Sequence, residues 1–200
     1  MKGAYLAICE GSGILLLLIS MGVLAMTKVI LADDLTGALD SGVKFLIKGP
    51  VIVQIASCET SNLLPKDSFV VVNTGTREMK PEKAKGVLTR IIDSLAIDNG
   101  KTLLFKKIDS NMRGNVGAEL EAIYASLDFK NFLLCPANPP QGRKVQNAKV
   151  YLDNRPLSEK SILEILASQT NLPVRHLSVR ETQSCLLYTS DAADEGLGVD

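Results

Sequence analysis

The sequence has few of the residues from which metal centres and hydrolytic triads are built. Its 200 residues include one histidine, His176, and four cysteines, at positions 9, 58, 135 and 185, with no Cys-x-x-Cys pair among them. A single histidine cannot hold a structural metal ion alone, and no Ser-His-Asp signal is present. Scattered thiols are typical of a reducing compartment, so we expect a cytoplasmic protein without a metal site, in which the cysteines act as small buried hydrophobes.

The chain also lacks the two glycine-rich patterns that cradle phosphates. Neither G-x-G-x-x-G nor G-x-x-x-x-G-K-[ST] occurs, and the acidic pair at positions 33 and 34 does not have the D-x-D spacing of aspartate-nucleophile phosphatases. Twenty-two basic residues balance twenty-two acidic ones. No net charge therefore steers the chain toward nucleic acid or an anionic membrane, and we expect neither as a stable partner.

The N-terminus carries an apolar run that is too short for an ordinary membrane helix. Residues 13–25 read GILLLLISMGVLA, which is below the roughly 20 residues that a spanning helix needs. We expect translation to start at Met26 and residues 1–25 to be an apolar leader outside the fold. A secretory signal or a membrane tether is the alternative.

The C-terminus also looks foreign to the rest of the chain. Residues 185–195 read CLLYTSDAADE, which resembles one reading frame of a transposase sequencing adapter, and they have neither helical nor strand periodicity. The alternative is a genuine acidic tail. We expect one domain over residues 26–184, with residues 185–200 as an adapter-like tail.

Between these ends, short apolar runs alternate with helical patterns. Such alternation predicts an α/β fold with a mostly parallel sheet and helices on both faces. A turn at Asp153-Asn154 suggests a small hairpin arm near residues 150–157. The expected strands are 29–32, 51–56, 68–73, 102–105 and 131–135, and the expected helices follow residue 34 and cover 81–95, 118–127 and 161–169.

Polar clusters follow several of these strands. In the stretch VILADDLTGALDSG (29–42), Ala38 and Leu39 continue at helical spacing after the acidic pair, and Val43, Phe45 and Leu46 extend the pattern. Further clusters lie at 73–77, 107–115 and 138–143. Because the carboxyl ends of parallel strands share one edge of a sheet, these clusters can converge on one cleft.

Mixed carboxylates and cations suit a small polyhydroxylated acid. Arg77, Lys107 or Arg113 could hold its carboxylate, while aspartates accept hydrogen bonds from its hydroxyls. Each residue also has a structural interpretation: Asp34 as a helix N-cap, Arg77 as a solvated loop residue, and Lys107, Asp109 and Arg113 as an ion-pair network. Taken alone, the residues indicate a polar small-ligand cleft and name no reaction.

Four segments in order carry a family resemblance over about residues 28–177. They are ADDLTGALDSG, NTGTRE, KKIDSNMRGNVGAELEA and CPANPPQGR with the later VYLDNRPLSE, and together they resemble the N-terminal domain of the four-carbon acid sugar kinases. The resemblance implies a Rossmann-like domain that binds threonate, erythronate or 3-oxo-tetronate. It also implies a separate C-terminal domain that binds ATP with Mg²⁺ and supplies phosphate to the terminal hydroxyl of the acid.

The resemblance further implies which side chains surround the substrate. Phosphoryl transfer depends mainly on positioning and charge neutralisation, so cations and hydroxyl-binding groups matter most, and Asp34 is the candidate general base. The implied positions are Asp33, Asp34, Arg77, Lys107, Asp109, Arg113 and Asn115.

The chain departs from the family pattern twice. The segment after Glu159 is about a dozen residues shorter than the family has, and the nucleotide-binding domain is absent from the 200 residues. We therefore expect the substrate-binding half of a kinase, inactive alone. The alternative function is a non-catalytic domain that binds small sugar acids.

Overall fold

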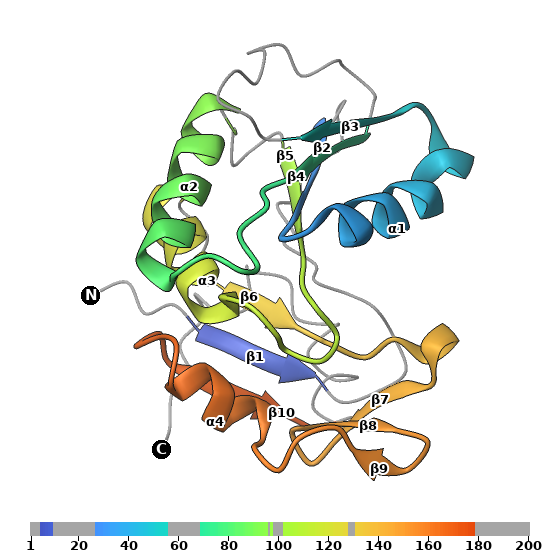
Figure 1. Cartoon of the computed structure of the whole chain (residues 1–200), viewed down its shortest axis with the longest axis vertical. Coiled ribbons are helices and arrows are strands. Elements are labelled where there is room, and N and C mark those ends of the chain that lie inside the picture. The colour runs from blue at the N-terminus through green and yellow to red at the C-terminus, as the bar shows by residue number, and fades with distance from the viewer. Residues whose placement is uncertain are drawn as a thin grey trace, which may run out of the picture.

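A four-stranded parallel sheet forms the centre of the fold. The computed structural model describes residues 5–9, 27–55, 69–95, 97, 102–127 and 131–178. The central sheet has the order β3-β4-β2-β5, with β2 at Thr27–Ala32, β3 at Val51–Ile55, β4 at Phe69–Asn73 and β5 at Thr102–Lys107. Helix α1 (Leu35–Phe45) covers one face, and α2 (Pro81–Ser94) and α3 (Val116–Ser126) cover the other (Figure 1). The predicted α/β fold is confirmed.

The strands of this sheet are apolar on both sides because both faces are covered. Val29 and Leu31 of β2 join the core formed with α2 and α3, whereas Ile30 and Ala32 pack on the side of α1. Continuous apolar runs of this kind are typical of buried parallel strands. In the register of the sheet, Ala32 lies opposite both Asn73 and Lys107, so β2, β4 and β5 end level at one edge.

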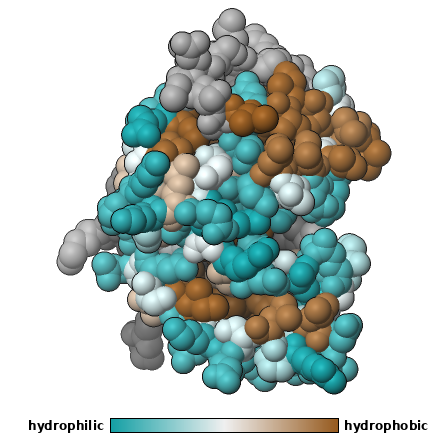
Figure 2. All heavy atoms as spheres, in the orientation of Figure 1, coloured by the Kyte–Doolittle hydropathy of each residue, from teal (hydrophilic) through white to brown (hydrophobic). Residues whose placement is uncertain are grey.

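Helix α1 packs on the sheet through its small residues. Its buried positions are Gly37, Ala38, Ser41 and Gly42, and a Cβ added to Gly42 would lie 3.3 Å from Val51 Cγ1. The larger residues at helical spacing face outward: Val43 is 65% exposed, and Leu39 and Leu46 are also exposed. They contribute to an apolar surface over α1 and β3 (Figure 2).

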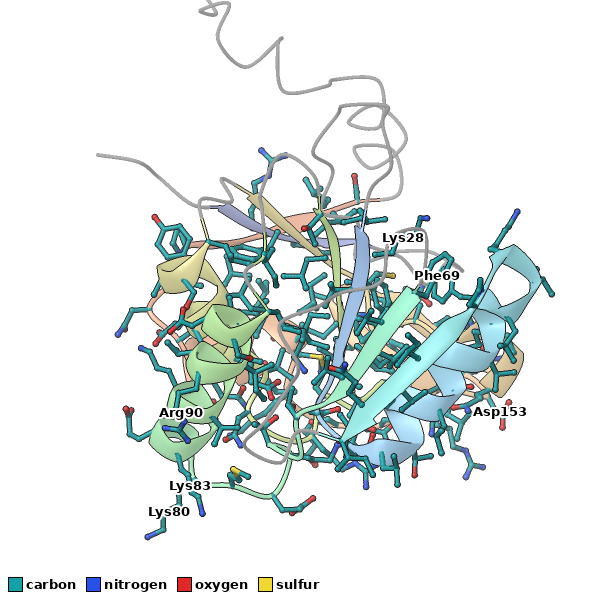
Figure 3. All side chains as sticks on the ribbon, turned by 90° about the horizontal axis from the view of Figure 1, so that it is seen from above. Lys28, Phe69, Lys80, Lys83, Arg90 and Asp153 are labelled. Carbon is teal, nitrogen blue, oxygen red and sulfur yellow. The ribbon has the colours of Figure 1, made fainter. Side chains whose placement is uncertain are left out.

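Helix α2 follows the sequence pattern closely. Pro81 occupies its first turn, where the absent N–H costs little. The predicted inner stripe is buried throughout, at Ala84, Leu88, Ile91, Ile92 and Leu95. Lys80, Lys83 and Arg90 lie on the outer side of this helix, away from the sheet, while Lys28 of β2 lies over the ring of Phe69 at 5.0 Å (Figure 3).

A second parallel sheet contains a strand from the N-terminal segment. Strand β1 (Tyr5–Cys9) pairs with β6 (Asn131–Leu134) on one side and β10 (Val174–Leu177) on the other. This differs from the expectation that all of residues 1–25 stay outside the fold. The physical reason is that β1 supplies backbone hydrogen-bonding partners to both neighbours. The apolar run 13–25 and the segment 185–200 lie outside the described residues.

The hairpin arm is confirmed, and it begins earlier than the sequence indicated. After the short 3₁₀ turn η2 (Pro139–Gln141), strands β7 (Arg143–Gln146), β8 (Lys149–Leu152) and β9 (Arg155–Pro156) form an antiparallel sheet. Asn147-Ala148 and Asp153-Asn154 connect these strands, all with positive φ, as tight hairpin turns require. Another 3₁₀ turn, η1 (Leu46–Lys48), ends the first helix.

Helix α4 (Ile162–Ala167) completes the described elements. Its N-terminus has a capping box, in which the Ser161 hydroxyl accepts from the Glu164 N–H and the Glu164 carboxylate accepts from the Ser161 N–H. None of the helices among the described residues is long and apolar enough to cross a membrane.

Two helical glycines make a matched test of this packing. A Cβ at Gly117 would lie 2.6 Å from Gln169 Cβ and 2.9 Å from its carbonyl carbon, whereas a Cβ at Gly86 meets only Arg90 Nη1 at 3.9 Å. We expect Gly117→Ala to lower the free energy of unfolding by about 1–3 kcal/mol through overpacking. Gly86→Ala should raise it by about 0.5–1 kcal/mol. Urea unfolding measures both, and an equal effect of the two substitutions would contradict the described α3–Gln169 contact.

Candidate functional site

An open hollow lies where β2 and β4 end. Its volume is about 330 Å³, and it is lined by Asp33, Asp34, Leu35, Asn73, Gly75, Arg77, Glu78 and Arg113. The level ends of β2 and β4 place the segments after Ala32 and Asn73 side by side, which is where open α/β sheets bind ligands. Four of the seven sequence-predicted positions, Asp33, Asp34, Arg77 and Arg113, line this hollow.

Arg77 clamps the two adjacent carboxylates. Its Nε and Nη2 donate to the two oxygens of Asp33 at 2.9 and 2.8 Å, and its Nη1 donates to Asp34 Oδ2 at 2.5 Å. Burial opposes the charge on the guanidinium, but hydrogen bonding to Asp33 and the charges of Asp33 and Asp34 outweigh it and raise the pKa of Arg77. Arg77 is therefore no solvated loop residue. All three of its guanidinium nitrogens already hold carboxylates.

Asp34 both caps a helix and faces the hollow. Its Oδ1 accepts the Gly37 N–H at 2.7 Å, as an N-cap residue does. Its side chain is 28% exposed, whereas that of Asp33 is 1% exposed. The structural interpretation of Asp34 as an N-cap holds, and the same carboxylate is the more accessible of the pair. A Cβ at Gly37 would lie 2.7 Å from Asp34 Oδ1, so this cap geometry requires glycine.

Arg113 is the more exposed of the two arginines. Asp109 Oδ2 accepts from its Nε at 2.8 Å and Oδ1 accepts from its Nη2 at 3.0 Å, while 64% of the Arg113 side chain remains exposed. Burial would raise the pKa of Asp109, but hydrogen bonds from Arg113 and the charges of Arg113 and Arg77 lower it instead. Asp109 thus positions Arg113 at the rim, and Arg113 Nη1 has no partner among the described residues.

Lys107 lies at the end of β5 beside the same edge. Its Nζ donates to the Ile108 carbonyl at 2.8 Å. Burial lowers the pKa of Lys107. The negative charges of Asp33 and Asp40 raise it again, but they offset this lowering only in part. Its Cγ would lie 3.4 Å from a Cβ at Gly37, so the side chain runs past the N-terminus of α1 without lining the hollow.

Asn115 supports the site from below and does not face it. Its Nδ2 donates to the carbonyls of Thr76 and Met79 at 2.9 and 2.8 Å, which holds the turn that carries Arg77. Gln169 holds the backbone on both sides of Asn115. Its side-chain oxygen accepts from the Gly117 N–H at 2.9 Å, and its side-chain nitrogen donates to the Gly114 carbonyl at 3.1 Å.

A buried chain of charges and hydroxyls underlies the Arg77 turn. Lys106 Nζ lies 3.0 Å from Glu119 Oε2, with side-chain exposures of 0% and 1%. Thr76 donates its hydroxyl hydrogen to Glu119, and Thr76 Oγ1 lies 2.7 Å from Thr74 Oγ1. Thr74 in turn donates to the Ala32 carbonyl at 2.9 Å. The chain therefore joins α3, β5 and β2 directly beneath the hollow.

Sequence reasoning missed this chain, although two signals indicate it. Lys106 alternates in register with the buried Thr102 and Leu104 of β5, and Glu119 lies among the buried residues at the start of α3. Opposite charges at two buried positions require pairing. The prediction that β5 ends at Phe105 placed Lys106 outside the strand.

No group of three or more His, Cys, Asp or Glu residues that could hold a metal ion occurs within the described part of the chain. Of the three carboxylate residues that line the hollow, Asp33 and Asp34 are paired with Arg77. The hollow therefore suits a small polar ligand.

Comparison with known proteins assigns the family. The sequence profile of the family described as "Sugar-binding N-terminal domain" matches residues 28–195. The chain belongs to this family. The matched range contains the whole site and continues past Ser184, into the segment that we expected to be foreign.

Two curated relatives are longer than this chain. The chain is 29% identical over 189 residues to the D-threonate kinase of Salmonella typhimurium, covering 86% of this chain and 44% of that protein. It is 28% identical over 163 residues to a 3-oxo-tetronate kinase of Pseudomonas fluorescens, covering 72% and 38%. The chain thus spans less than half the length of these curated relatives.

A crystal structure of a domain of unknown function from Bordetella bronchiseptica has the same fold. Its TM-score to this chain is 0.54 at 26% identity, over 82% of this chain and 40% of that one. That structure is described as a domain-swapped dimer with bound citrate. The resemblance to the sugar-acid kinase N-terminal domain is therefore confirmed in both sequence and structure.

The buried Lys106–Glu119 pair gives a sharp stability test in this domain. Lys106→Met leaves an uncompensated buried carboxylate, and we expect it to lower the free energy of unfolding by about 3–5 kcal/mol. Adding Glu119→Gln keeps an acceptor for Thr76 and removes that charge, so the double variant should recover much of the loss.

The matched control is Lys85→Met in the more exposed Lys85–Glu121 pair, whose side chains are 38% and 24% exposed. This substitution should change the free energy of unfolding by less than about 1 kcal/mol. Urea denaturation compares the four proteins. Equal losses in Lys106→Met and Lys85→Met would contradict the buried pair.

Proposed function

We propose that this domain binds a four-carbon sugar acid in the hollow at the ends of β2 and β4. The observation that carries the proposal is the composition of the hollow, where the partly exposed Asp34 lies beside the rim guanidinium of Arg113. A carboxylate accepts hydrogen bonds from ligand hydroxyls, and a guanidinium binds a ligand carboxylate. The names of the D-threonate and 3-oxo-tetronate kinases and the citrate of the Bordetella structure support an acidic, oxygen-rich ligand.

We assign different roles to the predicted residues. Each guanidinium nitrogen of Arg77 donates to Asp33 or Asp34, so we assign Arg77 to shaping the site rather than to holding the acid. We assign the carboxylate of the ligand to Arg113, with Lys107 as a second cation nearby. Asp34 accepts from a hydroxyl and is the proposed general base, while Asp109 and Asn115 position their neighbours.

In the whole protein, we propose that the bound acid is phosphorylated at its terminal hydroxyl with ATP and Mg²⁺. The names of the kinase relatives support this reaction class. The residues described here supply no phosphate loop and no cluster of metal ligands, so we assign the nucleotide to another part of the protein. The use of ATP and the scattered thiols support a cytoplasmic location.

Titration of the chain with D-threonate tests the proposal. We expect saturable binding by calorimetry without ATP, and Arg113→Gln should weaken it about tenfold to a hundredfold because a charge-assisted bond is lost. Arg90→Gln, on the outer side of α2 (Figure 3), is the control and should bind as the unaltered chain does. Failure to bind D-threonate and D-erythronate would refute the proposal.

The lowered pKa of Lys107 predicts a pH dependence of binding. An anionic ligand favours the protonated amine, and burial makes Lys107 lose its proton below the ordinary pKa of 10.5. Affinity for D-threonate should therefore fall as pH rises through this lowered pKa, before pH 10.5 is reached. Lys107→Met should bind more weakly at neutral pH and lose this alkaline decline. An unchanged decline in that variant would exclude Lys107 as its source.

A further inference from the structure

A second, smaller cavity lies between the segments that follow β5 and β6. Its volume is about 30 Å³, and its polar lining includes Lys107, Ser110 and Asn138. One water molecule needs roughly 10–15 Å³ of such space, so the cavity has room for a single hydroxyl-bearing group and little more.

Asn138 lines this cavity and carries a buried side-chain oxygen that lacks a hydrogen-bond donor among the described residues. The residue is 6% exposed, and no described residue donates a hydrogen bond to its Oδ1. Its backbone is anchored to the hairpin arm, because its N–H donates to the Arg143 carbonyl at 2.9 Å and its carbonyl accepts from the Arg143 N–H at 3.0 Å. Buried polar atoms are nearly always paired, so an anchored and unpaired acceptor indicates a ligand.

Lys107 supplies the complementary group. An ammonium carries three N–H donors, and one of those on Lys107 is used on the Ile108 carbonyl. A cavity with a cationic donor and an amide oxygen matches a hydroxyl, which accepts one hydrogen bond and donates another. A methylene group would leave the Asn138 oxygen unpaired.

The small cavity and the open hollow lie at the ends of neighbouring strands, because β2, which leads into Asp33 and Asp34, pairs with β5, which ends at Lys107. A Cβ at Gly37 would lie 2.7 Å from Asp34 Oδ1 and 3.4 Å from Lys107 Cγ. Asp34 lines the hollow and Lys107 lines the cavity. Side chains that line the two spaces therefore approach each other around Gly37.

We propose that this cavity is a subsite for a secondary hydroxyl of the sugar acid and that Asn138 determines the preference for hydroxylated acids. The inference rests on the proposed function, because it places the same ligand in both spaces. The carboxylate lies at Arg113, a secondary hydroxyl binds between Lys107 and Asn138, and the terminal hydroxyl stays in the open hollow.

Calorimetry with two ligands tests the subsite. D-Threonate has secondary hydroxyls, whereas 4-hydroxybutyrate retains the carboxylate and terminal hydroxyl but lacks them. The unaltered chain should bind D-threonate at least about tenfold more tightly, since an unpaired buried acceptor is penalised. Asn138→Leu should reduce this ratio to near one while preserving the affinity for 4-hydroxybutyrate. Asn138→Ala is a second variant with the same expectation, and Asn171→Leu, at an exposed asparagine, should leave the ratio unchanged.

The outcomes separate the two proposals. If the unaltered chain prefers D-threonate and both Asn138 variants keep that preference, the subsite is refuted while the proposed function stands. Equal weakening of both ligands would also refute it, because Asn138 would then serve the fold alone. If the unaltered chain binds neither ligand, the proposed function and the subsite fail together.

Discussion

The clamp of Arg77 on Asp33 and Asp34 is the interaction on which the site depends. Two neighbouring carboxylates repel each other at the end of a strand, and one guanidinium that donates from three nitrogens offsets this repulsion. The clamp joins the ends of β2 and β4, leaves Asp34 free to cap α1, and keeps Asp33 buried. Because Arg77 is used in this way, we propose that Arg113 and Lys107, on the neighbouring segment, provide the positive charge for the ligand.

The rest of the polar framework holds the turn that carries Arg77. The side chain of Asn115 donates to backbone carbonyls of the turn. The Thr76 hydroxyl donates to Glu119, which forms a buried ion pair with Lys106. A buried ion pair is expensive to desolvate, and its value here is positional, because it joins α3 and β5 to the loop above. Rigid support of this kind pre-orders a site before any ligand arrives.

Two spaces of different character result from this framework. The open hollow is lined by charged side chains, of which Asp33, Asp34 and Arg77 are paired with one another. Such side chains can exchange a contact within the protein for a contact with a ligand. The small cavity is lined by Asn138, whose side-chain oxygen has no partner among the described residues. Under the proposed function, the charged groups of the hollow bind the acid and Asn138 discriminates among acids. In this proposal affinity and selectivity arise from different residues along one edge of the sheet.

The local sequence pattern was sufficient to predict the alternation of strands and helices, the buried stripe of α2 and the acidic pair that follows β2. Periodicity and polarity at the end of a strand are properties of short segments, so they can be read from the sequence. The outward-facing large residues of α1 were not predictable in that way, since they follow from how closely Gly37 and Gly42 allow the helix to approach the sheet. Nor could the sequence pattern reveal that Lys106 pairs with Glu119 or that Arg77 binds Asp33 and Asp34. It also could not show that Asn138 Oδ1 has no partner among the described residues. These are contacts between residues distant in the chain, and only the packed fold brings them together.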